Sequence, residues 1–169
     1  FHVIEFGDGS VLQWNELVQF GWLKVSGTDG DDSLTAPDLD IVVYGGAGND
    51  TLRGSNLVHS TLDGGAGNDS LIGGRGDNTF IFGRGYGHDT VSVEYDTSAE
   101  RRNLVRLVGL TVDEVDFQVK FSHNYGSSRY DHVVITIKET GETLTLLCPI
   151  LTTNGVMHPC NPYGFYDLE

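Results

Sequence analysis

The sequence predicts an all-β fold: a right-handed parallel β-roll, or β-solenoid, with a strand-rich C-terminal cap and a small N-terminal hairpin. The first observation is a nine-residue repeat across residues 27–91, which reads glycine, glycine, any, glycine, any, aspartate, any, hydrophobic, any. The second is ordinary alternation of apolar and polar residues from residue 92 onward. A short fixed period favours stacked repeats over a single globular core. We therefore expect a flanking hairpin segment at 1–24, the roll at 25–92 and the capping segment at 93–169.

The N-terminal segment has the pattern of a hairpin followed by a short helical stretch. HVIEF and VLQW are extended runs that flank the turn residues Gly7–Ser10. NELVQFGWL then carries apolar residues at helical spacing, with Asn15 as a candidate N-cap. We expect one pair of strands and one short helix turn before the repeats.

The repeat block keeps its apolar position more faithfully than its glycines. Three copies are nearly complete: GTDGDDSLT from Gly27, GGAGNDTLR from Gly45 and GGAGNDSLI from Gly64. GGRGDNTFI from Gly73 keeps the glycines but shifts the acid. The apolar residues of successive units are Leu34, Val43, Leu52, Leu62, Leu71, Phe80 and Val91. A flexible glycine-rich linker has no reason to place an apolar residue at such regular intervals, so we expect a continuous roll.

Two repeats are expected to form one coil, with a strand on each side and a turn at each edge, so alternate turns share an edge. Turns with an aspartate at the sixth position fall on the first edge: Gly27–Asp32, Gly45–Asp50, Gly64–Asp69 and a looser Gly85–Asp89. The second edge holds turns without it: Ala36–Ile41, Ser55–Ser60 and Gly73–Asn78. The acids should therefore line one edge only.

Glycine turns that direct carbonyl oxygens inward beside a carboxylate suit Ca²⁺. Mg²⁺ fits less well because it demands near-ideal octahedral geometry, and transition metals prefer imidazole or thiolate ligands. We expect about three ions between successive turns of the first edge. A weak extra site using Asp77, with Asp96 nearby, is an alternative on the second edge. A single aspartate in such a turn would be explained by turn formation alone, but four in register are not.

The C-terminal part predicts strands at Asn103–Leu110, Val115–Phe121, His132–Lys138 and Thr143–Leu147, the last two joined by the turn ETGE. VDFQVKF, at Val115–Phe121, alternates perfectly and indicates a half-buried strand. An open solenoid end exposes apolar core and an unpaired strand edge. We expect this segment to cover that end, as terminal caps do in repeat proteins.

Composition excludes several classes of partner. The net charge of −14 argues against nucleic acid and against an anionic membrane surface. No apolar run is long enough to span a membrane. The sequence begins at Phe1 without a signal peptide, which suggests a piece of a longer protein. Cys148 and Cys160 are equally well explained by a disulfide or by two free thiols, and a zinc site is disfavoured.

GGAGNDTL and GGAGNDSL resemble the RTX (repeat-in-toxin), haemolysin-type calcium-binding nonapeptide, and the resemblance covers residues 27–91. The stretch Asp77–Val91 is similar to the end of such blocks, and residues 104–147 are similar to the strand-rich segment that follows them. His2–Trp14 resembles the piece that commonly follows that segment. Its position before the repeats suggests a parent protein with several RTX units in tandem.

The resemblance implies type I secretion from a bacterium in an unfolded state, and folding outside the cell when calcium is met. It also implies ligands, namely backbone oxygens at alternate turn positions plus the sixth-position aspartate. These are Gly27, Asp29, Asp31 and Asp32; Gly45, Ala47, Asn49 and Asp50; Gly64, Ala66, Asn68 and Asp69; and Gly85, Gly87 and Asp89.

The expected function is that of a calcium-binding, calcium-folded module of a secreted bacterial toxin or adhesin. No catalytic constellation is evident in the sequence, so we do not expect an enzyme. The alternative is an accessory module that binds carbohydrate or another substrate for a secreted hydrolase or epimerase. The expected partners are calcium, the parent polypeptide with its neighbouring RTX units, and a host-cell or glycan receptor.

Overall fold

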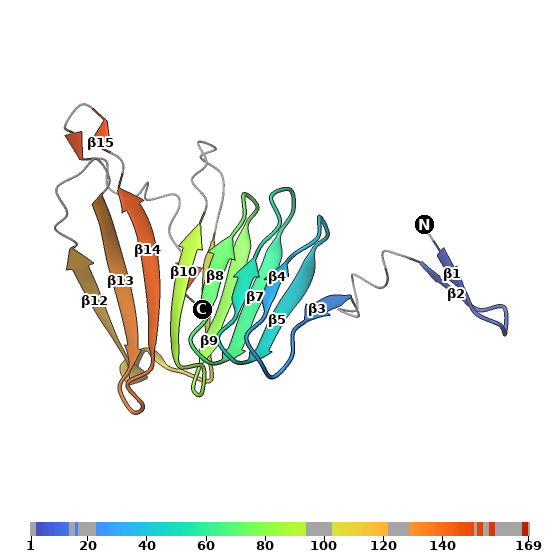
Figure 1. Cartoon of the computed structure of the whole chain (residues 1–169), viewed down its shortest axis with the longest axis horizontal. Helices are drawn as coiled ribbons and strands as arrows, with labels where there is room; N and C mark the ends of the chain where they lie inside the picture. The colour runs from blue at the N-terminus through green and yellow to red at the C-terminus, as the bar shows by residue number, and fades with distance from the viewer. Residues whose placement is uncertain are drawn as a thin grey trace.

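The computed structural model describes residues 3–13, 16, 23–93, 103–121, 129–150, 152–153, 156–157 and 167–168. Strands dominate the described residues, and the short 3₁₀ turn η1 (Val112–Glu114) precedes one of them (Figure 1). The described residues contain no helix that is long and apolar enough to cross a membrane.

The predicted N-terminal hairpin is confirmed. β1 (Val3–Glu5) pairs antiparallel with β2 (Val11–Gln13). Asp8 closes the turn, because its Oδ1 accepts hydrogen bonds from the backbone N–H and the hydroxyl of Ser10 at 2.9 and 2.6 Å. The short helix turn expected after the hairpin lies almost entirely outside the described residues.

Two sheets form the roll, and successive strands alternate between them (Figure 1). Neighbouring roll strands within each sheet are parallel. The roll strands of the seven-stranded sheet are β4 (Ser33–Thr35), β6 (Thr51–Arg53), β8 (Ser70–Gly73) and β10 (His88–Val93). Those of the six-stranded sheet are β3 (Lys24–Ser26), β5 (Ile41–Ala47), β7 (Ser60–Ala66), β9 (Asn78–Gly83) and β11 (Leu104–Val108). The predicted parallel β-roll is therefore confirmed.

The periodic apolar residues form the core between the two sheets. From Val43 to Val91 each of them is 0% exposed, whereas Leu34 near the N-terminal end of the roll is only partly buried. Strand register stacks them in columns, since Leu52 lies beside Leu71, and Leu71 beside Val91. Truncating one such leucine to alanine typically costs about 2–5 kcal/mol of stability. The regular spacing thus specifies both the core and the register.

The turns divide between two edges as predicted. One edge, the aspartate edge, carries the turns that lead from β3 to β4, β5 to β6, β7 to β8 and β9 to β10. The opposite edge carries the turns from β4 to β5, β6 to β7 and β8 to β9. In Figure 1 the aspartate edge is at the bottom of the roll and the opposite edge at the top.

The C-terminal hairpin covers the last coil in one sheet. β13 (Arg129–Ile137) and β14 (Thr143–Ile150) pair antiparallel, as the sequence predicts. β14 also pairs parallel with β10, so the edge of the last roll strand in this sheet is satisfied. In the other sheet β11 pairs parallel with β9, which places the strand expected near Asn103–Leu110 in the roll's own sheet. β17 (Asp167–Leu168) pairs in turn with β11.

β12 (Val115–Phe121) corrects one expectation. It pairs antiparallel with β13 as predicted, but from Val115 to Lys120, where burial is described, it is not half-buried: Phe117 is 48% and Val119 56% exposed, and only Val115 is buried. The reason is its place at the end of the seven-stranded sheet, beyond both β13 and β14 and away from the roll core. Alternation indicates which side chains share a face, and it does not say what covers that face.

The remaining C-terminal strands are short. β15 (Thr152–Thr153) pairs antiparallel with β16 (Val156–Met157). Cys148 belongs to β14, whereas Cys160 and Asp96 lie outside the described residues. The choice between a disulfide and two free thiols therefore stays open, and the weak metal site with Asp96 stays a prediction.

Candidate metal centre

The sixth-position aspartates form a hydrogen-bonded ladder along the aspartate edge. The backbone N–H of Asp32 donates to Asp50 Oδ1 at 2.8 Å, and that of Asp50 donates to Asp69 Oδ1 at 2.8 Å. The N–H of Asp69 donates in the same way to Asp89 Oδ1 at 2.9 Å. Each carboxylate from Asp50 onward is thereby fixed between its own turn and the turn before it.

The second oxygens of these carboxylates are buried and have no hydrogen-bond partner. They are Asp50 Oδ2, Asp69 Oδ2 and Asp89 Oδ2, on side chains of residues 1–3% exposed. Asp32 differs, since its Oδ2 accepts bonds from Thr28 N at 2.6 Å and Thr28 Oγ1 at 2.8 Å. A buried, ionised oxygen without a partner is strongly unfavourable. A bound cation would supply the missing partner, so the residues present fit a metal ion.

Glycine at the first two turn positions makes this arrangement sterically feasible. A Cβ on Gly45 would lie 2.1 Å from Asp50 Oδ2, so the carboxylate occupies the space that a side chain would need. Gly46 has φ +118°, and a Cβ there would lie 2.0 Å from the carbonyl oxygen of Thr28 in the previous coil. The glycines therefore allow both the turn conformation and the close stacking of coils.

A second ladder runs through the fifth turn positions in the opposite direction. Asn49 N donates to Asp31 Oδ1 at 2.6 Å, Asn68 N to Asn49 Oδ1 at 3.0 Å, and His88 N to Asn68 Oδ1 at 3.0 Å. Sequence reasoning assigned only backbone ligands to these positions and missed their side chains. The recurrence of Asp or Asn at the fifth position was the available signal.

Electrostatics on the aspartate edge oppose the ionised carboxylates. Burial, and to a smaller extent the nearby charges of Asp69, Glu142 and Asp63, raise the pKa of Asp89 to about 8. Burial is also the main cause of the raised pKa values of Asp69 and Asp63. A divalent cation beside these groups would favour their charged forms. The edge is therefore strained electrostatically unless a cation or protons neutralise it.

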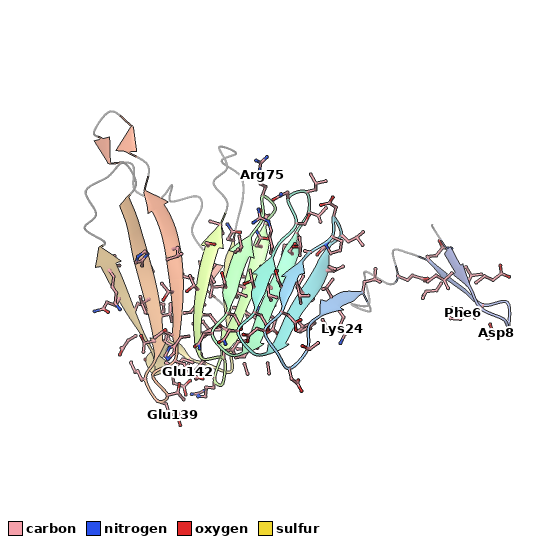
Figure 2. All side chains as sticks on the ribbon, viewed as in Figure 1. Phe6, Asp8, Lys24, Arg75, Glu139 and Glu142 are labelled. Atoms are coloured by element: carbon pink, nitrogen blue, oxygen red, sulfur yellow. The ribbon has the colours of Figure 1, made fainter. Side chains whose placement is uncertain are left out.

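The cap contributes a further carboxylate to the last turn of this edge. Glu142 accepts the N–H of Gly85 at 2.9 and 3.1 Å, one distance to each carboxylate oxygen, and the N–H of Gly87 at 3.2 Å. Figure 2 shows Glu142 and Glu139 at the lower edge of the cap, level with the aspartate edge. Arg84, next to Gly85, donates to Glu114, to Glu139 and to the carbonyl oxygen of Gly109. Nothing in the repeat pattern pointed to Glu142.

The predicted ligand residues lie along this edge, but they differ in how exposed they are. Ala47 and Ala66 lie side by side in register, and Asp29 is exposed at the first turn. No group of three His, Cys, Asp or Glu side chains among the described residues is arranged to hold a metal. The turns that end at Asp50, Asp69 and Asp89 therefore supply one buried carboxylate each, and further ligands would have to be backbone carbonyl oxygens, the donor type that Ca²⁺ accepts.

Residues 42–56 and 60–88 match the family described as the RTX calcium-binding nonapeptide repeat (4 copies). A comparison with curated protein sequences gives no match. Among solved structures the chain is similar to the extracellular lipase LipA from Serratia marcescens, at 27% sequence identity and a TM-score of 0.48. That likeness covers 73% of this chain and only 18% of the lipase chain. The turns within residues 42–56 and 60–88 therefore match RTX calcium-binding nonapeptide repeats, in agreement with the resemblance of the sequence.

Proposed function

We propose that this chain is a calcium-binding module that folds on calcium outside the cell, as part of a larger bacterial toxin or adhesin secreted by a type I pathway. The observation that carries the proposal is the row of buried carboxylate oxygens without partners at Asp50, Asp69 and Asp89. They recur once per coil on one edge; Asp50 and Asp69 lie within the matched RTX repeats, and Asp89 directly follows them. The role is binding and structural, with no catalytic step assigned to these residues.

The carboxylates of Asp50, Asp69 and Asp89 would each hold one ion, between successive turns of the aspartate edge. Backbone carbonyl oxygens of the same turns would complete each ligand set. This gives about three ions per chain, because Asp32 already has local partners for its second oxygen. Oxygen-only ligands in flexible glycine turns favour Ca²⁺ over Mg²⁺ and over transition metals.

Calcium would supply the free energy that the roll lacks without it. At a free concentration ten times the dissociation constant, each ion stabilises the folded state by about 1.4 kcal/mol. Consecutive ions share turns, so their binding is expected to be cooperative. Low cytoplasmic calcium would then keep the chain unfolded during secretion, and extracellular calcium would fold it.

The deciding experiment removes calcium with a chelator and follows circular dichroism and thermal melting. We expect loss of β signal and a lower melting temperature, both restored by added Ca²⁺, with a calorimetric count of about three ions. Mg²⁺ at the same concentration is the matched control and should restore much less. Unchanged β signal and melting temperature in the chelator would refute the proposal.

A further inference from the structure

Among the described residues, the last turn of the opposite edge is Gly73–Asn78, which has the glycine pattern of a calcium turn but ends in an amide. Its sixth position, Asn78, is 1% exposed and lies in register with Ser60 of the preceding coil. In Figure 2, Arg75 marks the tip of this turn at the top of the roll, away from Glu142. The turn therefore has the glycine pattern of a metal site without its sixth-position carboxylate.

The side chain of Asn78 directs an N–H₂ donor toward its own turn. The aspartates of the other edge from Asp50 onward instead carry a carboxylate oxygen without a partner. Asn78 Nδ2 donates to the carbonyl oxygens of Gly76 at 2.7 Å and Gly74 at 3.2 Å, and to Asn103 Oδ1 at 3.1 Å. The acceptors around Nδ2 fix the orientation of the amide, because a flipped amide would set its oxygen against all of them.

The ladder of the aspartate edge also has a neutral counterpart here. The backbone N–H of Asn78 donates to Asn103 Oδ1 at 3.2 Å, much as Asp69 N donates to Asp89 Oδ1. Asn103 is itself buried, at 7% exposed. An amide thus stands at both steps of this ladder, where the aspartate edge has carboxylates.

We propose that the Asn78 amide takes the place of a metal ion, so that the turn Gly73–Asn78 closes without calcium. The N–H₂ group donates hydrogen bonds to the carbonyl oxygens of Gly74 and Gly76. A bound cation would hold carbonyl ligands together in the same way. Asn78 Oδ1 is left buried and without a partner, and Gly54 makes room for it: a Cβ there would lie 2.7 Å away. The inference rests on the proposed calcium function of the other edge.

Asn78→Asp tests the proposal with almost no change in shape. The new carboxylate would face the carbonyl oxygens of Gly74 and Gly76, which is repulsive until a cation binds between them. Calorimetry should count one more calcium ion per chain than the wild type binds. Folding should also need a higher calcium concentration. The same ion number and the same calcium midpoint as the wild type would overturn the proposal.

Asn78→Ser is the second variant, chosen because serine already occupies the sixth position at Ser60. It removes the amide donor without adding charge. In saturating calcium we expect a lower melting temperature with the wild-type ion number, and an unchanged melting temperature would overturn the amide closure. Asn78→Ser also tests closure of the turn by the amide if Asn78→Asp fails to fold. It remains informative if the wild type binds no calcium, a result that would refute the proposed function alone.

Discussion

At the scale of single residues, each ladder aspartate from Asp50 onward has two separable tasks. One oxygen accepts a backbone N–H from the previous coil and so fixes the stacking of the turns. The other oxygen is buried without a protein partner and is available to a cation. Register and metal binding therefore depend on the same side chain but on different atoms of it.

Asp69→Asn should separate the two tasks, because asparagine keeps the size and one acceptor oxygen but loses the charge. We expect calorimetry to count about one ion fewer, with the strands still paired in excess calcium. Asp29→Asn is the matched control: Asp29 is exposed, and only its backbone oxygen is a candidate ligand, so the ion number should not change. An Asp69→Asn variant with the full ion number would contradict the assignment.

Gly46→Ala tests the close approach of coils. At φ +118° an added methyl group would meet the Thr28 carbonyl at 2.0 Å, so the backbone must move and the roll should lose its β signal even in calcium. Gly109→Ala also places alanine at positive φ, +66°, but with nothing within 4 Å. It should cost only the conformational strain, about 1–2 kcal/mol. Chemical denaturation of both variants gives the comparison, and equal losses of stability would contradict the steric argument.

At the scale of elements, the hairpin of β13 and β14 is joined to the roll by strand pairing and by charge. β14 continues the parallel ladder of β10, and Glu142 holds two N–H groups of the last turn. Arg84 ties the same turn to Glu114 and Glu139. The cap therefore contacts the last turn of the aspartate edge directly, and does not only cover apolar surface.

Glu142→Ala should weaken calcium binding at the last turn, since the N–H groups of Gly85 and Gly87 lose the acceptor that positions them. We expect the calcium midpoint of folding to rise while the number of ions stays the same. Glu139→Ala is the control, because Glu139 makes only an exposed ion pair with Arg84, and such pairs contribute little. A midpoint that rose equally in both variants would point to a general loss of surface charge instead.

The sequence was sufficient for the elements that repeat and insufficient for those that do not. Periodicity predicted the apolar columns through Val43 and Leu62 and the division of turns between two edges. It could not predict Glu142, because that contact joins residues far apart in the sequence and belongs to no repeat. The exposure of Phe117 was missed for a similar reason: the covering of a strand depends on its place in the sheet.

At the scale of the whole molecule, net charge and calcium are coupled. The chain carries a net charge of −14, and the buried carboxylates lie along one edge of the roll. Three divalent ions would reduce that charge to about −8 at the points where the acids are closest. Folding and neutralisation are then one event, which accounts for a roll with short strands and many glycines that still has a continuous core.

The in-register stacking of near-identical turns also bears on how a gene for such a protein can change length. Gly46 lies beside Gly65 and Leu52 beside Leu71, within two copies of GGAGND. Deleting residues 46–64 would join Gly45 to Gly65 and restore the same motif across the junction. We expect the shortened protein to fold in calcium and to bind one ion fewer, as measured by circular dichroism and calorimetry. Whole coils are thus units that recombination can add or remove, whereas a loss of a few residues would put the two coils beside the deletion out of register.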